Sequence, residues 1–502
     1  MTMQAGLPLF TRAAGHPERP AITAPEGRFT YGDLLSASAI IAARLLDGAR
    51  DLAEARVAFL VPPSFAYVAA QWGIWRAGGV AVPLAVSHPP GELAYVLDDT
   101  SAAVVIAHPE LADRVRPLAE ERGLSLLLTT ELLASGPPGP GAEAPLLPHL
   151  TPDRRAMILY TSGTTSRPKG VVTTHANIEA QVTSLVEAWG WRPDDRILLI
   201  LPLHHVHGII NVLTCALWSG AHCTIHPRFE PDATWAAIAG GELTLFMAVP
   251  TIYSRLITAW EAAPPERQAA LSAGCRNLRL MVSGSAALPV SVLERWREIS
   301  GHVLLERYGM TEIGMALSNP LHGARRPGHV GAPLPGVSVR LVDEEGSPVE
   351  PGTPGEIEVQ GPAVFLEYWQ RPEATAGAFR EGWFRTGDIA VLEEGSYRIL
   401  GRSSVDIIKT GGYKVSALEI EEVFREHPAI RECAVVGLPD PEWGERVGLA
   451  VTGEAIALDQ LRAWAGERLA PYKLPTRLLR LDELPRNAMG KVTKPDLVKL
   501  FR

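Results

Sequence analysis

Short apolar segments alternate with helical segments in the first part of the chain, and this alternation constrains the fold more than any other feature. The pattern predicts strands at 56–61, 80–84 and 102–107, separated by helices at 64–77 and 92–99. Strands that alternate with helices form βαβ units around a mainly parallel sheet. Because 502 residues exceed the roughly 250–300 over which a single core grows, we expect two or more domains.

Further segments complete an α/β architecture. A second α/β unit follows, with a helix at 175–189 and a buried strand at 196–201. Short strands and turns from 330 to 400 predict a small β-rich subdomain. We therefore expect a large N-terminal domain at 1–401, built from two βαβ-type subdomains and the β-rich subdomain, and a small α+β C-terminal domain at 405–502.

The residue totals exclude several classes of protein. A net charge of −9, with 46% hydrophobic and 21% charged residues, describes a soluble globular protein without a nucleic-acid surface. Four cysteines occur without a C-x-x-C pair, so neither a disulfide framework nor a zinc site is predicted. No apolar run approaches the roughly 18 residues of a membrane span, and the start lacks a signal-peptide core. We expect a cytoplasmic protein that binds no membrane, with the mature form of an imported organelle protein as the alternative.

The stretch LYTSGTTSRPKG at 159–170 follows a predicted buried strand. Small residues let backbone N–H groups approach an anion, hydroxyls add donors, and a lysine adds positive charge. The order does not match the Walker A pattern G-x-x-x-x-G-K-[ST]. A polar loop between strands is the alternative, but five hydroxyl residues before Pro-Lys-Gly favour phosphate binding. The candidate phosphate-binding residues are Thr161, Ser162, Gly163, Thr164, Thr165 and Lys169.

Two other strand ends are candidate pocket walls. Three histidines occur in PLHHVHG at 202–208, but no carboxylate lies at ligand spacing, so a pocket wall is favoured over a metal site. The predicted strand within 278–286 ends in Ser283, Gly284 and Ser285. Ligands of open α/β sheets bind at the carboxyl ends of strands, which makes both segments part of the predicted pocket.

Five motifs together resemble the adenylate-forming superfamily of acyl-CoA synthetases, luciferases and adenylation domains. They are TSGTTSRPKG at 161–170, YGMTE at 308–312, TGD at 386–388, GR at 401–402 and PRNAMGK at 485–491. Because they cover nearly the whole chain, it is identified as a member of that superfamily. The resemblance implies a two-step ligase that uses ATP, Mg²⁺ and CoA. A carboxylate attacks the α-phosphate of ATP, and a thiol then displaces AMP from the acyl-adenylate.

The resemblance also implies which residues bind the nucleotide. Thr311 would hydrogen-bond the α-phosphate, and Glu312, with Thr165, would hold Mg²⁺, a hard cation that neutralises phosphate oxygens. Alone, Y-G-x-T-E would fit an aromatic turn with an exposed glutamate, but its spacing after the phosphate stretch favours a nucleotide site. The other implied residues are Ser285 and Ala286 beside the adenine, Tyr308 stacked on it, the adjacent Gly309 and Met310, Asp388 at the ribose hydroxyls and Arg402 at ribose or phosphate.

Lys491 would be the catalytic lysine, bridging the substrate carboxylate and the α-phosphate in the pentavalent transition state. A lysine near a chain end is more often solvated, and only the P-R-N-x-M-G-K context favours catalysis. The resemblance implies that the C-terminal domain rotates about a hinge at 402–404. The family usually has Asp or Lys where this chain has Ser404. The residues implied to serve CoA on the opposite face are Lys409, Gly411, Gly412, Tyr413 and Lys414.

Arg307 is the predicted selector of the acid, because many members have a small or neutral residue before Y-G-x-T-E. A guanidinium that faces a pocket needs an anion, and its fork suits a second carboxylate. Segments ERYGMTE, PLHHVHG and VPTIYSR resemble malonyl-CoA synthetases, and SVDIIKTGGYKVSALE resembles their mitochondrial malonyl/methylmalonyl branch in animals. The implied small dicarboxylic acid is malonate or methylmalonate. Its pocket would contain Arg307, Arg255, His207 and Ser283, with His205 rearranging between the half-reactions.

Several alternatives stay open. Arg307 could form an ion pair with Glu306 and have no substrate role. The enzyme could load another acid onto CoA or onto a carrier protein. A non-catalytic nucleotide-binding protein is disfavoured because all five charged motif residues are present, namely Lys169, Glu312, Asp388, Arg402 and Lys491. Both a monomer and a homodimer fit the sequence.

Overall fold

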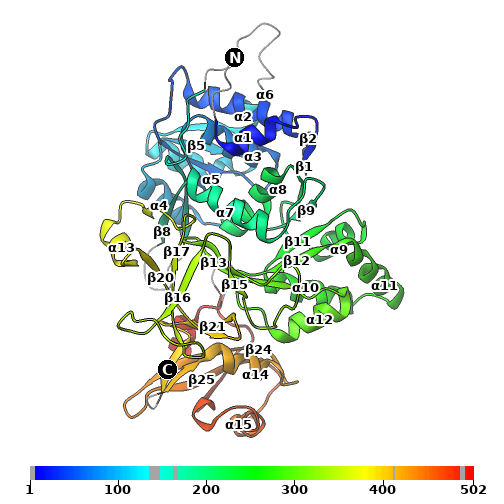
Figure 1. The fold of residues 1–502 in the computed structure, drawn as a ribbon, viewed down its shortest axis with the longest axis vertical. Helices are drawn as coiled ribbons and strands as arrows, with labels where there is room; N and C mark the ends of the chain where they lie inside the picture. Colours follow the sequence, from blue (N-terminus) through cyan, green and yellow to red (C-terminus); the bar gives the residue numbers. More distant parts are fainter. Residues whose placement is uncertain (1–5, 135–146, 162–167, 411–412, 487–491, 502) are drawn as a thin grey trace.

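The computed structural model describes residues 6–134, 147–161, 168–410, 413–486 and 492–501 (Figure 1). Two large sheets with surrounding helices form the upper part of the molecule, a β-rich subdomain lies below them, and the C-terminal domain forms the lower end (Figure 1). The predicted α/β fold, with its large N-terminal and small C-terminal parts, is therefore confirmed.

The first large sheet has nine strands in the order β15-β14-β13-β12-β11-β9-β10-β1-β2. Its strands from β13 to β1 are parallel, and both edges are antiparallel. The N-terminal hairpin thus pairs with a strand about two hundred residues later, at Ile22↔Cys223, which local pattern did not predict. The strands are β1 Pro20–Ala24, β2 Gly27–Thr30, β9 Arg196–Leu199, β10 His222–Ile225, β11 Leu245–Ala248, β12 Leu280–Ser283, β13 Leu305–Met310, β14 Gly314–Ser318 and β15 Ala332–Pro333.

The second large sheet has seven strands in the order β18-β8-β7-β4-β3-β5-β6. Strands β7 and β8 are antiparallel, so the candidate phosphate stretch joins two paired strands. Its edge strand β18 comes from much later in the chain and pairs with β8. The strands are β3 Arg56–Leu60, β4 Val80–Pro83, β5 Val104–Ala107, β6 Ser125–Leu128, β7 Arg155–Thr161, β8 Lys169–Thr174 and β18 Glu367–Tyr368.

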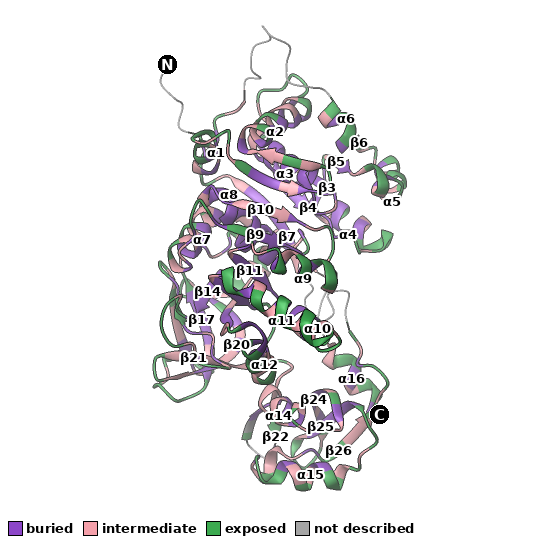
Figure 2. Cartoon of the chain, turned by 90° about the vertical axis from the view of Figure 1, so that its right-hand side faces the viewer, coloured by how far each residue is buried: buried purple, intermediate pink, exposed green. Residues whose placement is uncertain are grey.

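Helices cover both sheets. α2 begins in a capping box, where the Asp33 N–H donates to Thr30 Oγ1 at 3.1 Å and the Thr30 N–H donates to Asp33 at 2.8 Å. The core strands are buried, whereas outer helices such as α11 are mostly exposed (Figure 2). The helices are α1 Pro8–Ala14, α2 Tyr31–Leu46, α3 Phe65–Arg76, α4 Pro90–Thr100, α5 Pro109–Glu121, α6 Thr129–Ala134, α7 His175–Ala188, the π-helix η1 His207–Thr214, α8 Cys215–Ser219, α9 Pro231–Ala239, α10 Pro250–Glu261, α11 Pro265–Gly274, the 3₁₀-helix η2 Cys275–Asn277 and α12 Val290–Ser300.

The β-rich subdomain and the C-terminal domain each have a sheet of their own. The first contains β16 Ser338–Val342, β17 Gly355–Gln360, α13 Pro372–Gly377, β19 Phe379–Arg380, β20 Trp383–Glu393 and β21 Ser396–Arg402. The second contains β22 Ile407–Thr410, β23 Tyr413–Ser416, α14 Ala417–Arg425, β24 Ile430–Asp440, β25 Gly444–Gly453, α15 Leu458–Gly466, the 3₁₀-helix η3 Pro471–Lys473, β26 Arg477–Arg480 and α16 Lys494–Leu500. Within the described ranges, no helix is long and apolar enough to span a bilayer.

Candidate active site

Three predicted nucleotide-binding residues lie together. Asp388 on β20 is paired in register with Arg402 on β21, and Arg402 Nε lies 3.2 Å from Asp388 Oδ1. Tyr308, near the end of β13, donates its hydroxyl to Asp388 Oδ2 at 2.6 Å. Burial raises the pKa of Tyr308 well above its usual value, so the phenol stays a donor. The structure thus joins YGMTE to TGD, with Tyr308 and Asp388 eighty residues apart in the chain, and joins TGD to the nearby GR motif.

Glu312 lies in the turn between β13 and β14 and is almost fully buried. Its Oε1 accepts a 3.0 Å hydrogen bond from the hydroxyl of Tyr368 on β18, whereas its buried Oε2 has no partner among the described residues. Burial raises the pKa of Glu312 above its usual value. A buried carboxylate oxygen without a partner requires a cation or a donor, and this fits the predicted Mg²⁺ ligand.

The predicted phosphate lysine, Lys169, lies beside the ring of Tyr368. Lys169, at the start of β8, places Nζ 4.9 Å from the centroid of the Tyr368 ring. Lys169 and Pro168 also line an open cavity of about 610 Å³ between α4 and residues 370–371. At the cavity edge, Tyr95 of α4 donates its hydroxyl to the Pro168 carbonyl at 2.7 Å. Lys169 therefore borders accessible space.

Arg307 is buried in the structure. Its Nη2 donates to Ser285 Oγ at 3.3 Å, and Ser285 Oγ lies 3.2 Å from His207 Nδ1. No carboxylate of the described chain pairs with Arg307, and its buried Nε has no described partner. Burial lowers the pKa of Arg307 to about 9, so the guanidinium keeps its charge at neutral pH. Burial, followed by the charge of Arg307, lowers the pKa of His207 well below its usual value, which leaves a neutral imidazole.

The alternative ion pair between Arg307 and Glu306 does not form. Consecutive residues of a strand point to opposite faces of a sheet, and Glu306 instead accepts the N–H of Gly328 at 3.0 Å. Burial raises the pKa of Glu306 to about 8, so this carboxyl is mainly neutral at pH 7. Arg307 is therefore a buried charge whose neighbours are Ser285 and the Gly284 backbone.

The other predicted pocket residues occupy related positions. Ser283 ends β12 and is buried, and its hydroxyl has no partner among the described residues. Ser285 and Ala286 follow it and are exposed, with Ser285 at φ 71°, a left-handed conformation that non-glycine residues adopt mainly at special sites. His205 is half-buried before η1, with its ring centroid 4.1 Å from that of His204.

Some predicted residues do not share these contacts. Arg255 is exposed on α10, and its guanidinium lies 4.8 Å from the ring centroid of Phe229. Among the described residues, Arg255 has no contact with Arg307. Gly309 lies at a β-bulge, where an added Cβ would come within 2.1 Å of the Gly314 carbonyl oxygen. The close backbone packing by itself explains glycine there. Met310 and Thr311 are half-buried beside it.

The residues predicted to serve the hinge and CoA lie in and beyond the turn after β21. Ser404 is exposed in that turn. Lys409 is exposed on β22, and its N–H donates to Glu445 at 2.7 Å. Tyr413 is exposed and stacks on Tyr472, with ring centroids 4.2 Å apart. The predictions for Ser162, Gly163, Thr164, Thr165, Gly411, Gly412 and Lys491, and for the side chain of Lys414, lie outside the described residues.

Residues 9–369 match the family described as AMP-binding enzyme, and residues 419–491 match the AMP-binding enzyme C-terminal domain. The chain belongs to the AMP-binding enzyme family. The adenylate-forming resemblance is thereby confirmed. Residues 370–418 lie between the two matches and contain the predicted hinge. The domain boundaries at 401 and 405 stay a prediction.

This AMP-binding enzyme has relatives of nearly full length. It is 48% identical to the human mitochondrial malonate–CoA ligase, covering 98% of this chain and 92% of the relative. It is 47% identical to the mitochondrial malonate–CoA ligase of Xenopus laevis, covering 99% and 92%. A malonate–CoA ligase of Arabidopsis thaliana is 41% identical, covering 98% and 87%.

The mitochondrial location in the names of the animal relatives overturns the prediction of a cytoplasmic location. That prediction depended on four unpaired cysteines and on the lack of an apolar leader. Mitochondrial transit peptides are amphipathic and arginine-rich instead of apolar. The two features therefore do not separate the compartments.

Solved structures with the same fold include MatB from Rhodopseudomonas palustris in two states. The ATP-bound form superposes with a TM-score of 0.89, at 34% identity and with 99% of each chain covered. The apo form superposes with a TM-score of 0.81 at the same identity and coverage. A Bacillus subtilis o-succinylbenzoate–CoA synthetase in complex with ATP and a magnesium ion gives a TM-score of 0.85 at 28% identity, with 98% and 99% covered. By this measure, the whole chain superposes more closely on the ATP-bound form of MatB than on its apo form.

Proposed function

We propose that this AMP-binding enzyme activates malonate with ATP and transfers the malonyl group to CoA, releasing pyrophosphate and AMP. The same proposal includes methylmalonate as a second substrate of the enzyme. The deciding observation is the buried Arg307, which keeps its charge without a carboxylate partner in the described chain. A bound dicarboxylate would supply the missing anion. Nearly full-length similarity to malonate–CoA ligases supports this choice of acid.

The residues present fit ATP and Mg²⁺. Tyr308 and Arg402 each contact one carboxylate oxygen of Asp388 and hold it in place for the ribose hydroxyls. Lys169, the candidate phosphate lysine, borders the open cavity. The described residues contain no cluster of three or more metal-ligating side chains. One carboxylate, Glu312, suits Mg²⁺, which usually binds one or two carboxylates together with substrate phosphates. When bound, the ion would neutralise charge on the phosphate oxygens.

The chain would perform the reaction by positioning and charge. Arg307 would hold the distal carboxylate of malonate, supported by Ser285 and His207, so that the other carboxylate faces the α-phosphate of ATP. Lys491 would stabilise negative charge as the carboxylate oxygen bonds to phosphorus and pyrophosphate leaves. The thiolate of CoA would then attack the acyl carbon and displace AMP.

The direct test is pyrophosphate release with ATP, Mg²⁺ and each of acetate, propionate, malonate, methylmalonate and succinate, with and without CoA. We expect CoA-dependent turnover that is highest with malonate or methylmalonate, and malonyl-CoA in the products by mass spectrometry. Turnover that favours acetate or propionate would retain an adenylate-forming ligase but reject the dicarboxylate assignment.

A second prediction concerns the glycine beside the guanidinium. A Cβ added at Gly284 would lie 2.5 Å from Arg307 Nε, so Gly284→Ala must displace the guanidinium. We expect kcat/KM for malonate to fall by roughly ten- to a hundred-fold, the effect of about 1 Å of misplacement, with a smaller loss for propionate. Gly377→Ala is the control, because a Cβ there meets nothing within 4 Å. Equal losses on both acids would exclude an effect through Arg307.

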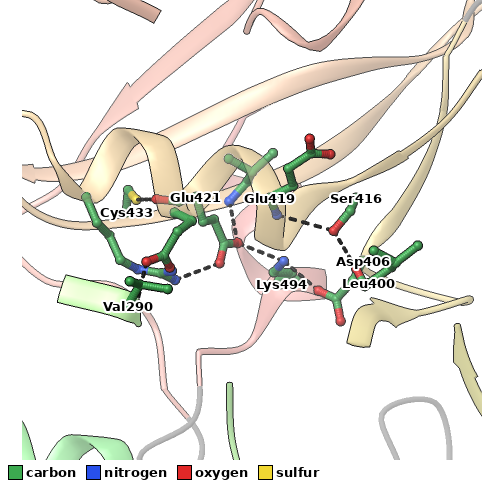
Figure 3. A network of polar contacts seen from close by, with 11 residues as sticks. Val290, Leu400, Asp406, Ser416, Glu419, Glu421, Cys433 and Lys494 are labelled. Carbon is green, nitrogen blue, oxygen red and sulfur yellow. Dashed lines mark hydrogen bonds and ion pairs between the residues drawn. The ribbon is translucent and has the colours of Figure 1, made fainter. Parts of the chain in front are cut away.

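A third prediction concerns docking of the C-terminal domain. At the start of α14, Ser416 Oγ donates to the Leu400 carbonyl (Figure 3). Glu422 of α14 accepts the N–H of Val290, the first residue of α12, at 2.7 Å. A charged acceptor at a helix N-terminus contributes about 0.3–1 kcal/mol. Because the arrangement is closer to the ATP-bound form of MatB, Glu422→Gln is expected to slow adenylation by roughly two- to fivefold. Thioester formation from supplied malonyl-adenylate is expected to stay unchanged.

Val290→Pro tests the same contact from the other domain. Proline removes the N–H and suits the first position of a helix, and Pro289 already has the extended conformation that a following proline requires. We expect the effects of Glu422→Gln and Val290→Pro on adenylation to be non-additive, since each removes the same bond. Glu426→Gln, the same charge change at an exposed site just after α14, is the control. Additive effects would contradict the docking role.

A further inference from the structure

Tyr368 contacts two candidate groups of the nucleotide site at once. Its hydroxyl donates to Glu312 Oε1 at 3.0 Å, and Lys169 Nζ lies 4.9 Å from its ring centroid. No motif of the sequence indicated a role for this tyrosine. One side chain nevertheless joins the candidate phosphate lysine to the candidate metal-binding carboxylate.

The position of Tyr368 is fixed from several sides. Its strand β18 pairs with β8, with Tyr368 opposite Val171, two residues after Lys169. Its N–H donates to Thr375 Oγ1 at 3.0 Å, and its ring packs edge-on against Phe365, with centroids 4.7 Å apart. The Phe365 N–H in turn donates to the carbonyl of Glu312 at 2.7 Å. Tyr368 and the backbone of Glu312 are therefore held in one rigid unit.

The two ends of Tyr368 act on opposite charges. The hydroxyl occupies one oxygen of Glu312, and this leaves the buried Oε2 as the oxygen without a described partner. The ring presents its π system to the Lys169 ammonium, to which aromatic faces are attracted. Within the described ranges, Lys169 forms no ion pair, although Asp98 and Asp99 line the same cavity, so the ring is the one described partner of its ammonium.

We propose that Tyr368 is a positioning residue of the adenylation step, whose hydroxyl orients Glu312 for the divalent cation and whose ring holds Lys169 beside the phosphates. The proposal depends on the proposed function for the identity of the reaction, but not for the choice of acid. It assigns separate consequences to the hydroxyl and to the ring, because each contacts a different partner.

Tyr368→Phe tests the hydroxyl, since it keeps the ring and its packing. The measurement is electron paramagnetic resonance of Mn²⁺, as a probe for Mg²⁺, bound with a non-hydrolysable ATP analogue. Removing a residue that hydrogen-bonds a metal ligand weakens metal affinity by roughly ten- to a hundred-fold, and we expect a loss in this range. Affinity for the analogue without divalent cation is expected to stay unchanged. Tyr397→Phe is the control, because it makes the same change at another buried tyrosine, which packs in the same apolar core of the β-rich subdomain as Tyr368.

Tyr368→Met tests the ring. We expect this variant to lose, in addition, roughly two- to thirtyfold in affinity for the analogue without divalent cation, the range of a cation–π contact. In a Lys169→Met background, Tyr368→Met is expected to cause no further loss of that affinity. Circular dichroism and the unfolding midpoint establish that each variant is folded, and Tyr368→Phe decides the hydroxyl role even if Tyr368→Met does not fold.

The outcomes separate this proposal from the proposed function. Wild-type Mn²⁺ affinity in Tyr368→Phe would overturn the role of the hydroxyl, and full loss by Tyr368→Met in the Lys169→Met background would overturn that of the ring. Both measurements use bound cation and nucleotide, so they stay valid if malonate is the wrong acid. Thioester formation from supplied malonyl-adenylate needs neither group, and a parallel loss there would indicate general damage instead of positioning.

Discussion

Arg307→Ala is expected to abolish most malonate turnover while leaving activity on a short monocarboxylic acid such as propionate. Removing one partner of a buried charged pair costs about 2–5 kcal/mol, so kcat/KM for malonate should fall by roughly thirty- to several-thousand-fold. Propionate has no distal carboxylate for Arg307 to bind, so its turnover should change little. Initial rates of pyrophosphate release on both acids give the ratio directly.

Two further measurements make the Arg307 prediction specific. Arg307→Lys keeps a charge but loses the planar fork, so we expect malonate activity between that of wild type and Arg307→Ala. The unfolding midpoint without substrate is expected to stay the same or rise in Arg307→Ala, because the variant removes a buried charge without a carboxylate partner in the described chain. A clear fall in the midpoint, with equal losses on both acids, would make Arg307 a structural residue.

Lys491→Ala is expected to block the first half-reaction and spare the second. Loss of a group that stabilises charge in the transition state costs roughly 10²–10³ in rate, so pyrophosphate release should fall by at least that factor. Thioester formation from supplied malonyl-adenylate and CoA should stay within a few-fold of wild type. Single-turnover assays of the two steps separate these effects.

The matched control for Lys491 is another lysine of the C-terminal segment. Lys499 on α16 is exposed and pairs only weakly at the surface, with Asp496 at 2.7 Å. Lys499→Ala should leave both half-reactions unchanged. Equal losses in the two half-reactions of Lys491→Ala would remove this lysine from a specific role in adenylation.

The local patterns of the sequence predicted most of the architecture. The strand and helix segments of the first half agree with β3, α3, β4, α4 and β5 to within a few residues, because apolar periodicity and caps are local properties. The motif residues Tyr308, Asp388 and Arg402 were also predicted, and the structure places them in direct contact. Arg307 was identified as a charge that needs an anion, and the structure places no carboxylate beside it in the described chain.

The contacts that the sequence could not predict connect distant segments. The β1–β2 hairpin joins the nine-stranded sheet through β10, and β18 joins the phosphate hairpin through β8. The same pairing brings Tyr368 to Glu312 and Lys169. Ser285 and His207, separated by 78 residues, meet only beside Arg307. Such pairs carry no periodic or spacing signal, since loop closure over many residues depends on the whole fold.

The sequence by itself determined the fold class and the family, because each depends on residue types in short, ordered motifs, whereas the residues of the nucleotide site stay a prediction. Tertiary structure alone decided whether Arg307 is paired. Glu306 is its neighbour in the chain, yet strand geometry turns that carboxyl to the opposite face, toward Gly328. Burial lowers the pKa of Arg307 only to about 9, so the guanidinium stays charged beside Ser285 at neutral pH, and this is the physical reason to expect a second carboxylate on the substrate.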